Sequence, residues 1–127
     1  MDRIFIAVAA LAGALSVGAD AAAQHFLAAD AVRAALAELG ARYGLIHAAV
    51  LIGVALLLEV PTGGLGRGAL ALSGWSFVLA LVCFCGGLFL HAGGHPAFAV
   101  IVPAGGMLFI AGWVLLLIHA LSPRPLA

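Results

Sequence analysis

The chain has 127 residues, of which 66% are apolar and 8% are charged, and its mean hydropathy is +1.29. Soluble domains carry about 25% charged residues and disordered chains are poor in apolar ones, so both classes are excluded and a membrane protein is predicted. Five arginines balance five acidic residues, and there is no lysine, so we expect no nucleic-acid partner.

Four long apolar segments follow one another along the chain. They cover residues 4–23, 43–60, 69–90 and 101–121. About 20 apolar residues in a helix, at 1.5 Å each, cross a hydrocarbon core that is roughly 30 Å thick. The backbone must satisfy its own hydrogen bonds in lipid, and the period-two pattern of barrel strands is absent. We therefore predict an all-α, four-helix transmembrane bundle that forms a single domain over residues 1–127.

The first apolar segment also has features of a secretory signal. Residues 1–3 carry charges, an apolar stretch follows, and the small residues after Asp20 would suit a cleavage site. We expect the segment to be retained as a membrane helix, because the other three helices would otherwise lose a packing partner rich in small residues.

The fourth apolar segment carries Pro103 near its start. Proline is best tolerated in the first turn of a helix, where its missing N–H costs no hydrogen bond. We therefore expect the regular helix to begin near Pro103, after an irregular lead-in over residues 98–102. A kinked helix that begins at Ala97 is the alternative.

The connection between the first two segments is long, and its residue pattern is typical of a helix. Asp30 can cap a helix, and Gly40 stands where a C-terminal cap belongs. Between them runs an apolar stripe at helical spacing. We therefore predict a short interfacial helix over residues 30–40 that lies in the headgroup plane. One long bent helix over residues 24–60 is the alternative.

Small residues are expected to hold the bundle together, because lipid tails are as apolar as leucine and helices therefore associate by close packing. The first helix offers Ala10, Ala14 and Gly18 at four-residue spacing. The full set of predicted packing positions is Gly13, Ala14, Gly18, Ala49, Gly53, Gly86, Gly87, Gly105, Gly106 and Gly112.

Tyr43 and His47 are the strongest candidates for a polar site, since they lie one helical turn apart on one face. We place them just inside the outer end of the second helix, with His25 as a weaker candidate beside them. One interpretation is a pair that handles protons or a quinone. The interpretation that we favour is an interhelical hydrogen bond that fixes the register of the helices.

The five histidines do not follow a known ligand pattern. His91 and His95 are separated by two glycines and do not share a helical face, and no HExxH or CxxC motif is present. We therefore predict no metal site, no cofactor, no catalytic residue and no enzymatic activity.

Three stretches resemble one family of small bacterial inner-membrane proteins. Residues 102–113 (VPAGGMLFIAGW) are similar to the Pro-x-Gly-Gly-x-x-Phe-x-Ala-Gly-Trp motif of domain-of-unknown-function family 423, which is related to the eukaryotic transmembrane protein 256 group. Residues 43–48 (YGLIHA) and 84–89 (FCGGLF) resemble its second and third helices, whereas residues 18–25 depart from its pattern. The resemblance implies four helices in the inner membrane and supplies no activity.

Three functional hypotheses remain open. The first is a structural or accessory subunit that packs against a larger membrane complex or against itself, which the small-residue faces and short loops favour. The second is a protein that handles protons, a quinone or a metal through Tyr43 and His47. The third is a small transporter, although few polar residues are available to line a pore.

Four crossings would place both termini on one side of the membrane. That side carries Arg3, Arg67 and Arg124, and the other side carries Arg33 and Arg42. Because cytoplasmic loops are richer in arginine and lysine, we expect a multi-pass protein of the bacterial inner membrane with cytoplasmic termini.

Overall fold

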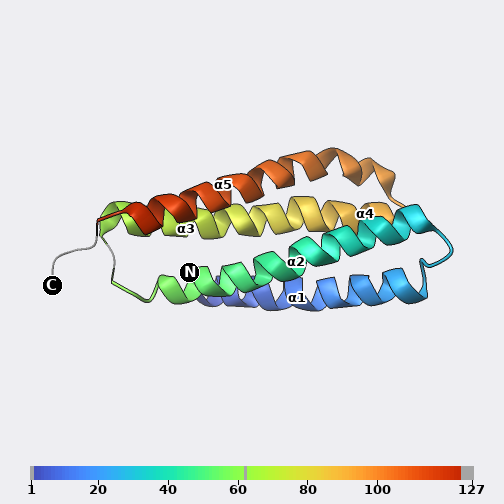
Figure 1. The fold of residues 1–127 in the computed structure, drawn as a ribbon, viewed down its shortest axis with the longest axis horizontal. Helices are drawn as coiled ribbons and strands as arrows, with labels where there is room; N and C mark the ends of the chain where they lie inside the picture. Colours follow the sequence, from blue (N-terminus) through green and yellow to red (C-terminus); the bar gives the residue numbers. More distant parts are fainter. Residues whose placement is uncertain (1, 62, 124–127) are drawn as a thin grey trace.

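Four helical spans pack side by side in the computed structural model, which describes residues 2–61 and 63–123 (Figure 1). The elements in chain order are α1 (Asp2–His25), α2 (Ala31–Leu57), α3 (Gly64–Ala80), the π-helix η1 (Leu81–Gly86), α4 (Gly87–Ala92), the 3₁₀-helix η2 (Pro96–Ile101) and α5 (Val102–Leu121). The described residues contain no strand, so the predicted all-α four-helix fold is confirmed.

Within the described residues, each of the four spans is long and apolar enough to cross a membrane. They are Arg3–His25, Ala31–Leu57, Gly64–Ala92 and Pro96–Leu121. The third span consists of α3, η1 and α4, and the fourth consists of η2 and α5. α1 begins and α5 ends at the same end of the bundle (Figure 1), as an even number of crossings requires. Arg124, which was counted for this end, lies outside the described residues.

The second span differs from the prediction. The structure has no separate interfacial helix over residues 30–40, because α2 is one unbroken helix that begins directly after Asp30. The carboxylate of Asp30 caps this helix by accepting the backbone N–H of Arg33 at 3.1 Å. Gly40 does not end the helix, since it lies against α4, where an added β-carbon would come 2.6 Å from the ring of Phe89. Glycine at this position allows two spans to approach closely.

Three buried alanines mark one level across the bundle. Ala37 packs with Ala23 and Ala92, which lie near the ends of α1 and α4. Twenty residues separate Ala37 from Leu57 at the other end of α2, which corresponds to about 30 Å of helix, the thickness of a hydrocarbon core. We use these two levels as reference boundaries for describing depth in the bundle; two charged residues of α2, Glu38 and Arg42, lie between them.

The fourth span begins irregularly, as the sequence predicts. Residues 96–101 form the 3₁₀-helix η2, and α5 begins at Val102 with Pro103 in its first turn. The alternative of one helix from Ala97 is correct in part, because η2 runs directly into α5 without a break, but the first six residues are 3₁₀-helical. Proline in the first turn leaves no interior hydrogen bond broken, which explains why the regular helix begins here.

Polar side chains and glycine join α3 to α5. The hydroxyl of Ser73 donates to the carbonyl of Gly112 at 2.8 Å, and the hydroxyl of Ser76 donates to the carbonyl of Leu108 at 2.8 Å. Gly112 itself lies against the ring of Phe77, where a β-carbon would come 2.6 Å from a ring carbon. Close approach of the two backbones brings these carbonyls within reach of short serine side chains.

The glycines and alanines that were predicted to pack helices divide into two groups. At Gly87, Gly105 and Gly112, an added β-carbon would come within 3.0 Å of atoms from a neighbouring segment. The other positions make looser contacts or none: Gly106 has ordinary contacts at 3.8 Å, Gly86 has its nearest atom at 4.0 Å, nothing lies within 4 Å at Gly13, Gly18 and Gly53, and Ala14 and Ala49 are exposed. Gly44 and Gly74, which the sequence analysis did not select, are also tightly packed.

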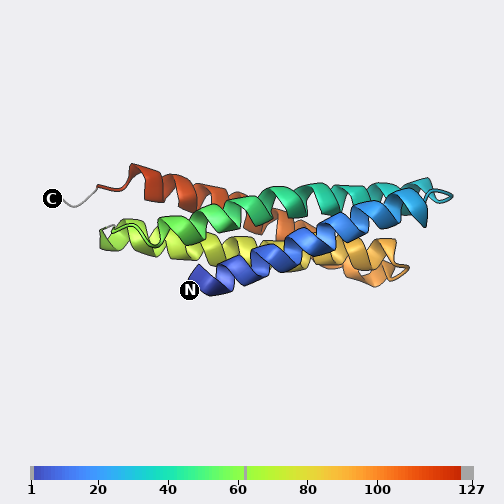
Figure 2. The ribbon, with the colours of Figure 1, turned by 90° about the horizontal axis from the view of Figure 1, so that it is seen from below.

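The spans associate mainly as two pairs. α1 lies along α2, and α5 lies along α3, while α2 links the pairs through α3, η1 and α4. In the view from below, α1 lies in front of the other spans (Figure 2). One side of α1 is therefore left uncovered by the rest of the chain.

Candidate functional site at the centre of the bundle

His47 lies in the second half of α2, midway between the levels of Ala37 and Leu57. Ten residues separate it from Ala37 and ten from Leu57, so it is about 15 Å along the helix from either reference boundary. Its side chain is 4% exposed. α2 begins at Ala31, twelve residues before the predicted start of the span, and its last charged residue before His47 is Arg42. That His47 lies just inside the outer end of the membrane core stays a prediction.

Both ring nitrogens of His47 are hydrogen-bonded. Nδ1 lies 2.8 Å from the backbone carbonyl of Tyr43, and the indole N–H of Trp113 donates to Nε2 at 3.2 Å. A carbonyl can only accept and an indole N–H can only donate, so we assign the neutral tautomer with the proton on Nδ1. The side chain thereby joins α2 to α5 in the middle of the bundle, where an unpaired polar group would be costly.

Aromatic rings surround the imidazole. Phe109 stacks on it with ring centroids 3.7 Å apart, and Phe77 lies at 5.5 Å. Tyr43 stacks at 5.9 Å and also contacts Phe84 at 4.9 Å. These rings come from α2, α3, η1 and α5, so the cluster is the point where three of the four spans meet.

A cavity of about 440 Å³ lies beside this cluster. Its lining includes Tyr43, His47, Phe84, Met107 and Trp113. Tyr43 and Trp113 are 38% and 46% exposed, so the cavity opens on the lipid-facing side of the bundle. The hydroxyl of Tyr43 has no hydrogen-bond partner among the described residues. The cavity therefore offers one free donor in an otherwise aromatic and apolar lining.

His25 does not join this site. It is exposed at the end of α1, beyond Ala23, and Ala23 is level with Ala37. It is therefore separated from His47 by about 15 Å along the bundle axis. No group of three or more histidine, cysteine or acidic side chains suited to a metal ion is found in the described part of the chain.

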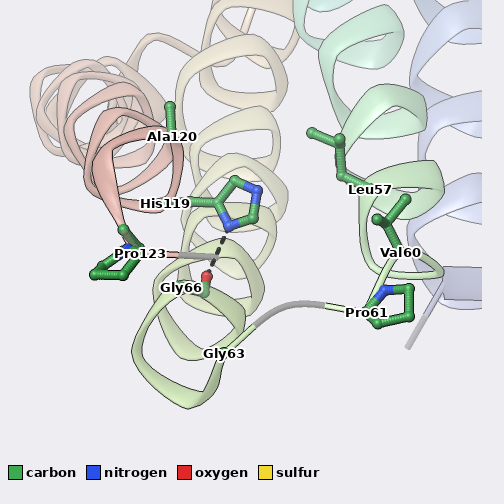
Figure 3. Close-up of a pocket in the computed structure, with 9 residues that line it drawn as sticks. Leu57, Val60, Pro61, Gly63, Gly66, His119, Ala120 and Pro123 are labelled. Carbon is green, nitrogen blue, oxygen red and sulfur yellow. Dashed lines mark hydrogen bonds between the residues drawn. The ribbon is translucent and has the colours of Figure 1, made fainter. Parts of the chain in front are cut away.

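A second cavity, of about 380 Å³, lies at the end of the bundle where α2 ends and α3 begins (Figure 3). His119 lines it, and its Nδ1 lies 2.9 Å from the carbonyl of Gly66. As this carbonyl can only accept, Nδ1 donates, and the contact ties the last turn of α5 to the first turn of α3. His119 is therefore another interhelical link.

Ser16 is a buried polar residue that the sequence analysis did not select. It is 1% exposed, faces Gly44 on α2, and its hydroxyl has no partner among the described residues. Its only sequence signal is a single serine in an apolar helix, which does not distinguish a buried hydroxyl from a lipid-facing one.

The fold and the site define a class: an α-helical integral membrane protein with four spans, whose central polar side chains pair across helices. The model of a family described as "Protein of unknown function (DUF423)" matches residues 19–106. The chain belongs to this family, and the resemblance described from the sequence is thereby confirmed.

Curated relatives match over almost the full chain. The UPF0382 membrane protein YwdK of Bacillus subtilis (strain 168) is 29% identical over 123 residues, which cover 94% of this chain and 98% of the relative. The UPF0382 inner membrane protein YgdD of Escherichia coli (strain K12) is 30% identical over 126 residues, covering 94% and 91%. The UPF0382 membrane protein SH2409 of Staphylococcus haemolyticus (strain JCSC1435) is 30% identical over 119 residues, covering 91% and 93%. No solved structure gives a significant match.

Proposed function

We propose that the protein is a non-enzymatic accessory subunit that associates with another transmembrane helix through the uncovered side of α1. The observation that carries this proposal is a row of small, exposed residues, which we call the α1 outer face. It consists of Ala7, Ala10, Ala14, Gly18 and Ala21. Their spacing of three and four residues places them on one side of the helix.

Larger residues border this face on both sides. Leu11 and Leu15 lie along one edge and Ile6 and Val17 along the other, and all four are exposed. The result is a shallow trough of the kind that lets a second helix approach closely in lipid. The partner helix can belong to a second copy of the chain or to another subunit.

The other outer helix, α5, shows a different surface. Most of its exposed residues are large, and they include Met107, Ile110, Val114, Leu117 and Leu121. Its exposed alanines, Ala104, Ala111 and Ala120, lie seven or more residues apart and form no continuous row. Large side chains suit contact with lipid tails, whereas small ones gain little from lipid and much from a close helix. The contrast between the two helices supports α1 as the associating surface.

The interior of the bundle supports a non-enzymatic role. Both nitrogens of His47 are used in hydrogen bonds, and Ser73 and Ser76 pair with carbonyls of α5. A general acid, base or metal ligand needs a group that is free to react. These side chains instead fix the relative positions of the helices.

Replacement of Ala10 by leucine tests the proposal, because it fills the trough on the α1 outer face. Ala111→Leu is the matched control, since Ala111 is exposed on α5. Native gel electrophoresis of mildly solubilised membranes should show the wild type and A111L in a species heavier than the 12.7 kDa chain. A10L should shift to the free chain. Wild-type protein that is monomeric in every mild detergent would contradict the proposal.

The cavity beside Tyr43 supports a second candidate function, the binding of a lipid-soluble carbonyl compound such as a quinone. A quinone ring that enters the cavity would stack on aromatic side chains, and its carbonyl oxygen would accept a hydrogen bond from the Tyr43 hydroxyl. His47 would hold the neighbouring side chains in place. A short-chain quinone should then quench Trp113 saturably in a Trp75→Phe background. Tyr43→Phe should weaken binding by about two- to tenfold through loss of one hydrogen bond. Quenching that never saturates would exclude this function.

We also propose that both termini face the cytoplasm. Arg3 and Arg67 belong to the end of the bundle where α1 begins, and arginine is enriched on the cytoplasmic side of membrane proteins. A reporter that is active only in the cytoplasm, fused after the last residue, should be active. Activity of a periplasm-specific reporter at the same position would reverse this orientation.

A further inference from the structure

A groove runs between α1 and α4, with α2 as its floor. Its volume is about 450 Å³, and its lining includes Ala14, Ala22, Ala37, Phe89 and Arg33. It extends along α1 from Ala14 to Phe26, which is twelve residues or about 18 Å of helix. One leaflet of a membrane core is about 15 Å thick, so the groove spans roughly one leaflet from the boundary inward.

The groove is narrow. Even the whole open space of about 860 Å³, spread over about 18 Å, gives a mean cross-section of only about 48 Å². A helix with its side chains is about 10 Å across, or about 80 Å² in cross-section, and does not fit within this area. An extended acyl chain is the membrane component that suits a channel of this shape.

Arg33 stands at the boundary end of the groove and supplies a positive charge. Its Nε donates to the carbonyl of Ala92, which fixes the guanidinium between α2 and α4. No ion pair or other partner of its terminal nitrogens is found among the described residues. The neighbouring carboxylates are engaged elsewhere, since Asp30 accepts the backbone N–H of Arg33 and Glu38 accepts from the side chain of Gln24.

We propose that this groove binds one anionic phospholipid, with its headgroup phosphate at Arg33 and one acyl chain along α1. A guanidinium held by a single bond keeps a pair of N–H groups for a phosphate, which it can bind in a bidentate manner. The cation lies at the level of the headgroups and the small residues below it leave room for the chain. The site is separate from the Tyr43 cavity and goes beyond the proposed accessory role. It shares Ala14 and Gly18 with the α1 outer face, so the acyl chain would border the surface proposed for a partner helix.

Native mass spectrometry of the full-length protein, released from neutral detergent, tests the proposal. The probes are phosphatidylglycerol, phosphatidylcholine with matched chains, and inorganic phosphate. One arginine near an anionic headgroup corresponds to about a fivefold preference for the anionic lipid. We expect one phosphatidylglycerol bound with this preference and no retained inorganic phosphate. Equal retention of the two lipids would overturn the proposal, and retention of inorganic phosphate alone would replace it with a simple anion site.

Matched variants separate the charge from the fold. Arg33→Gln and Arg33→Lys both lose the bond from Nε to Ala92, but only Arg33→Lys keeps the positive charge. Arg33→Gln should abolish the preference and Arg33→Lys should retain it. Arg42→Gln is the control, because Arg42 is exposed on the same helix and does not line the groove. A loss of preference in R33K as large as that in R33Q, or an equal loss in R42Q, would contradict the proposal.

The groove itself is tested by filling it. Ala22→Phe places a ring between α1 and α4 and should lower retention of both lipids, whereas Ala10→Leu lies outside the groove lining and should leave retention unchanged. Unchanged lipid binding in A22F would show that the chain lies elsewhere. Loss of helix association in A10L with normal lipid binding would keep the two proposals distinct.

Discussion

His47 shows how one side chain can link two helices in a medium that offers no water. Its Nδ1–H donates a hydrogen bond to the carbonyl of Tyr43, one turn earlier in the same helix. Its Nε2 accepts a hydrogen bond from the indole N–H of Trp113 on α5. The residue therefore leaves neither nitrogen unpaired at the depth where an unpaired group costs most.

The bond between His47 and Trp113 should be measurable as a coupling energy. Trp113→Phe keeps a ring but removes the donor, and His47→Leu removes the acceptor. A double-mutant cycle should give a coupling of about 0.6 kcal/mol, the average for hydrogen bonds between transmembrane helices, in unfolding followed in mixed detergent micelles.

Trp75 provides the control for this cycle. It contacts Phe5 and makes no recorded ring contact or hydrogen bond with His47, so Trp75→Phe and His47→Leu should be additive. A coupling of zero between His47 and Trp113, or an equal one between His47 and Trp75, would contradict the assigned hydrogen bond.

At the scale of elements, the contact between η1 and the start of α5 depends on one glycine. A β-carbon at Gly105 would come within 3.0 Å of backbone atoms of Phe84, and backbone atoms cannot move aside as a flexible side chain can. At Gly106 the nearest atoms belong to the same residue's ring at 3.8 Å, an ordinary contact. Adjacent glycines in one helix thus have different roles.

Alanine substitution at these two positions should separate those roles. Gly105→Ala should destabilise the protein by about 1–3 kcal/mol, the usual cost of overpacking. Gly106→Ala should be neutral or stabilising by up to about 1 kcal/mol, because alanine favours helix over glycine. The free energies of unfolding in detergent decide the matter, and similar values for the two variants would mean that the spans are not packed as described.

The second and fourth spans show what the sequence can and cannot predict about elements. The start of α5 at Pro103 was predictable, because a missing N–H is a local property of one residue. Gly40 was misinterpreted as a cap, because a glycine that ends a helix and a glycine that packs against Phe89 look the same without the partner span. The π-helix η1 has no sequence signal that we recognise.

The same limit applies to the site. The spacing of Tyr43 and His47 predicted that they share a helix face, which depends only on helix geometry. The hydrogen-bond partner of His47, Trp113, could not be predicted, since it depends on how α5 packs 66 residues later. Ser16 and the Arg33 groove were missed for the same reason.

At the scale of the whole molecule, most polar groups are directed inward or toward the ends of the bundle, and the outer surface is mainly apolar, with Asp20 and Arg42 as exposed charged residues. The His47 cluster, the serines of α3 and His119 each pair across helices. What remains on the outside is the contrast between the small residues of α1 and the large ones of α5. This contrast is the basis of the proposal that the protein associates with another helix within the membrane.

The depth of the His47–Trp113 pair tests this account most directly. Trp113 becomes the only tryptophan in a Trp75→Phe variant, and its fluorescence can be quenched in bilayers whose lipids carry bromine at defined positions along the acyl chain. We predict the strongest quenching by bromines near the chain ends, at the centre of the membrane. Strongest quenching by bromines next to the headgroups would place the pair at the surface and contradict the four-span bundle described here.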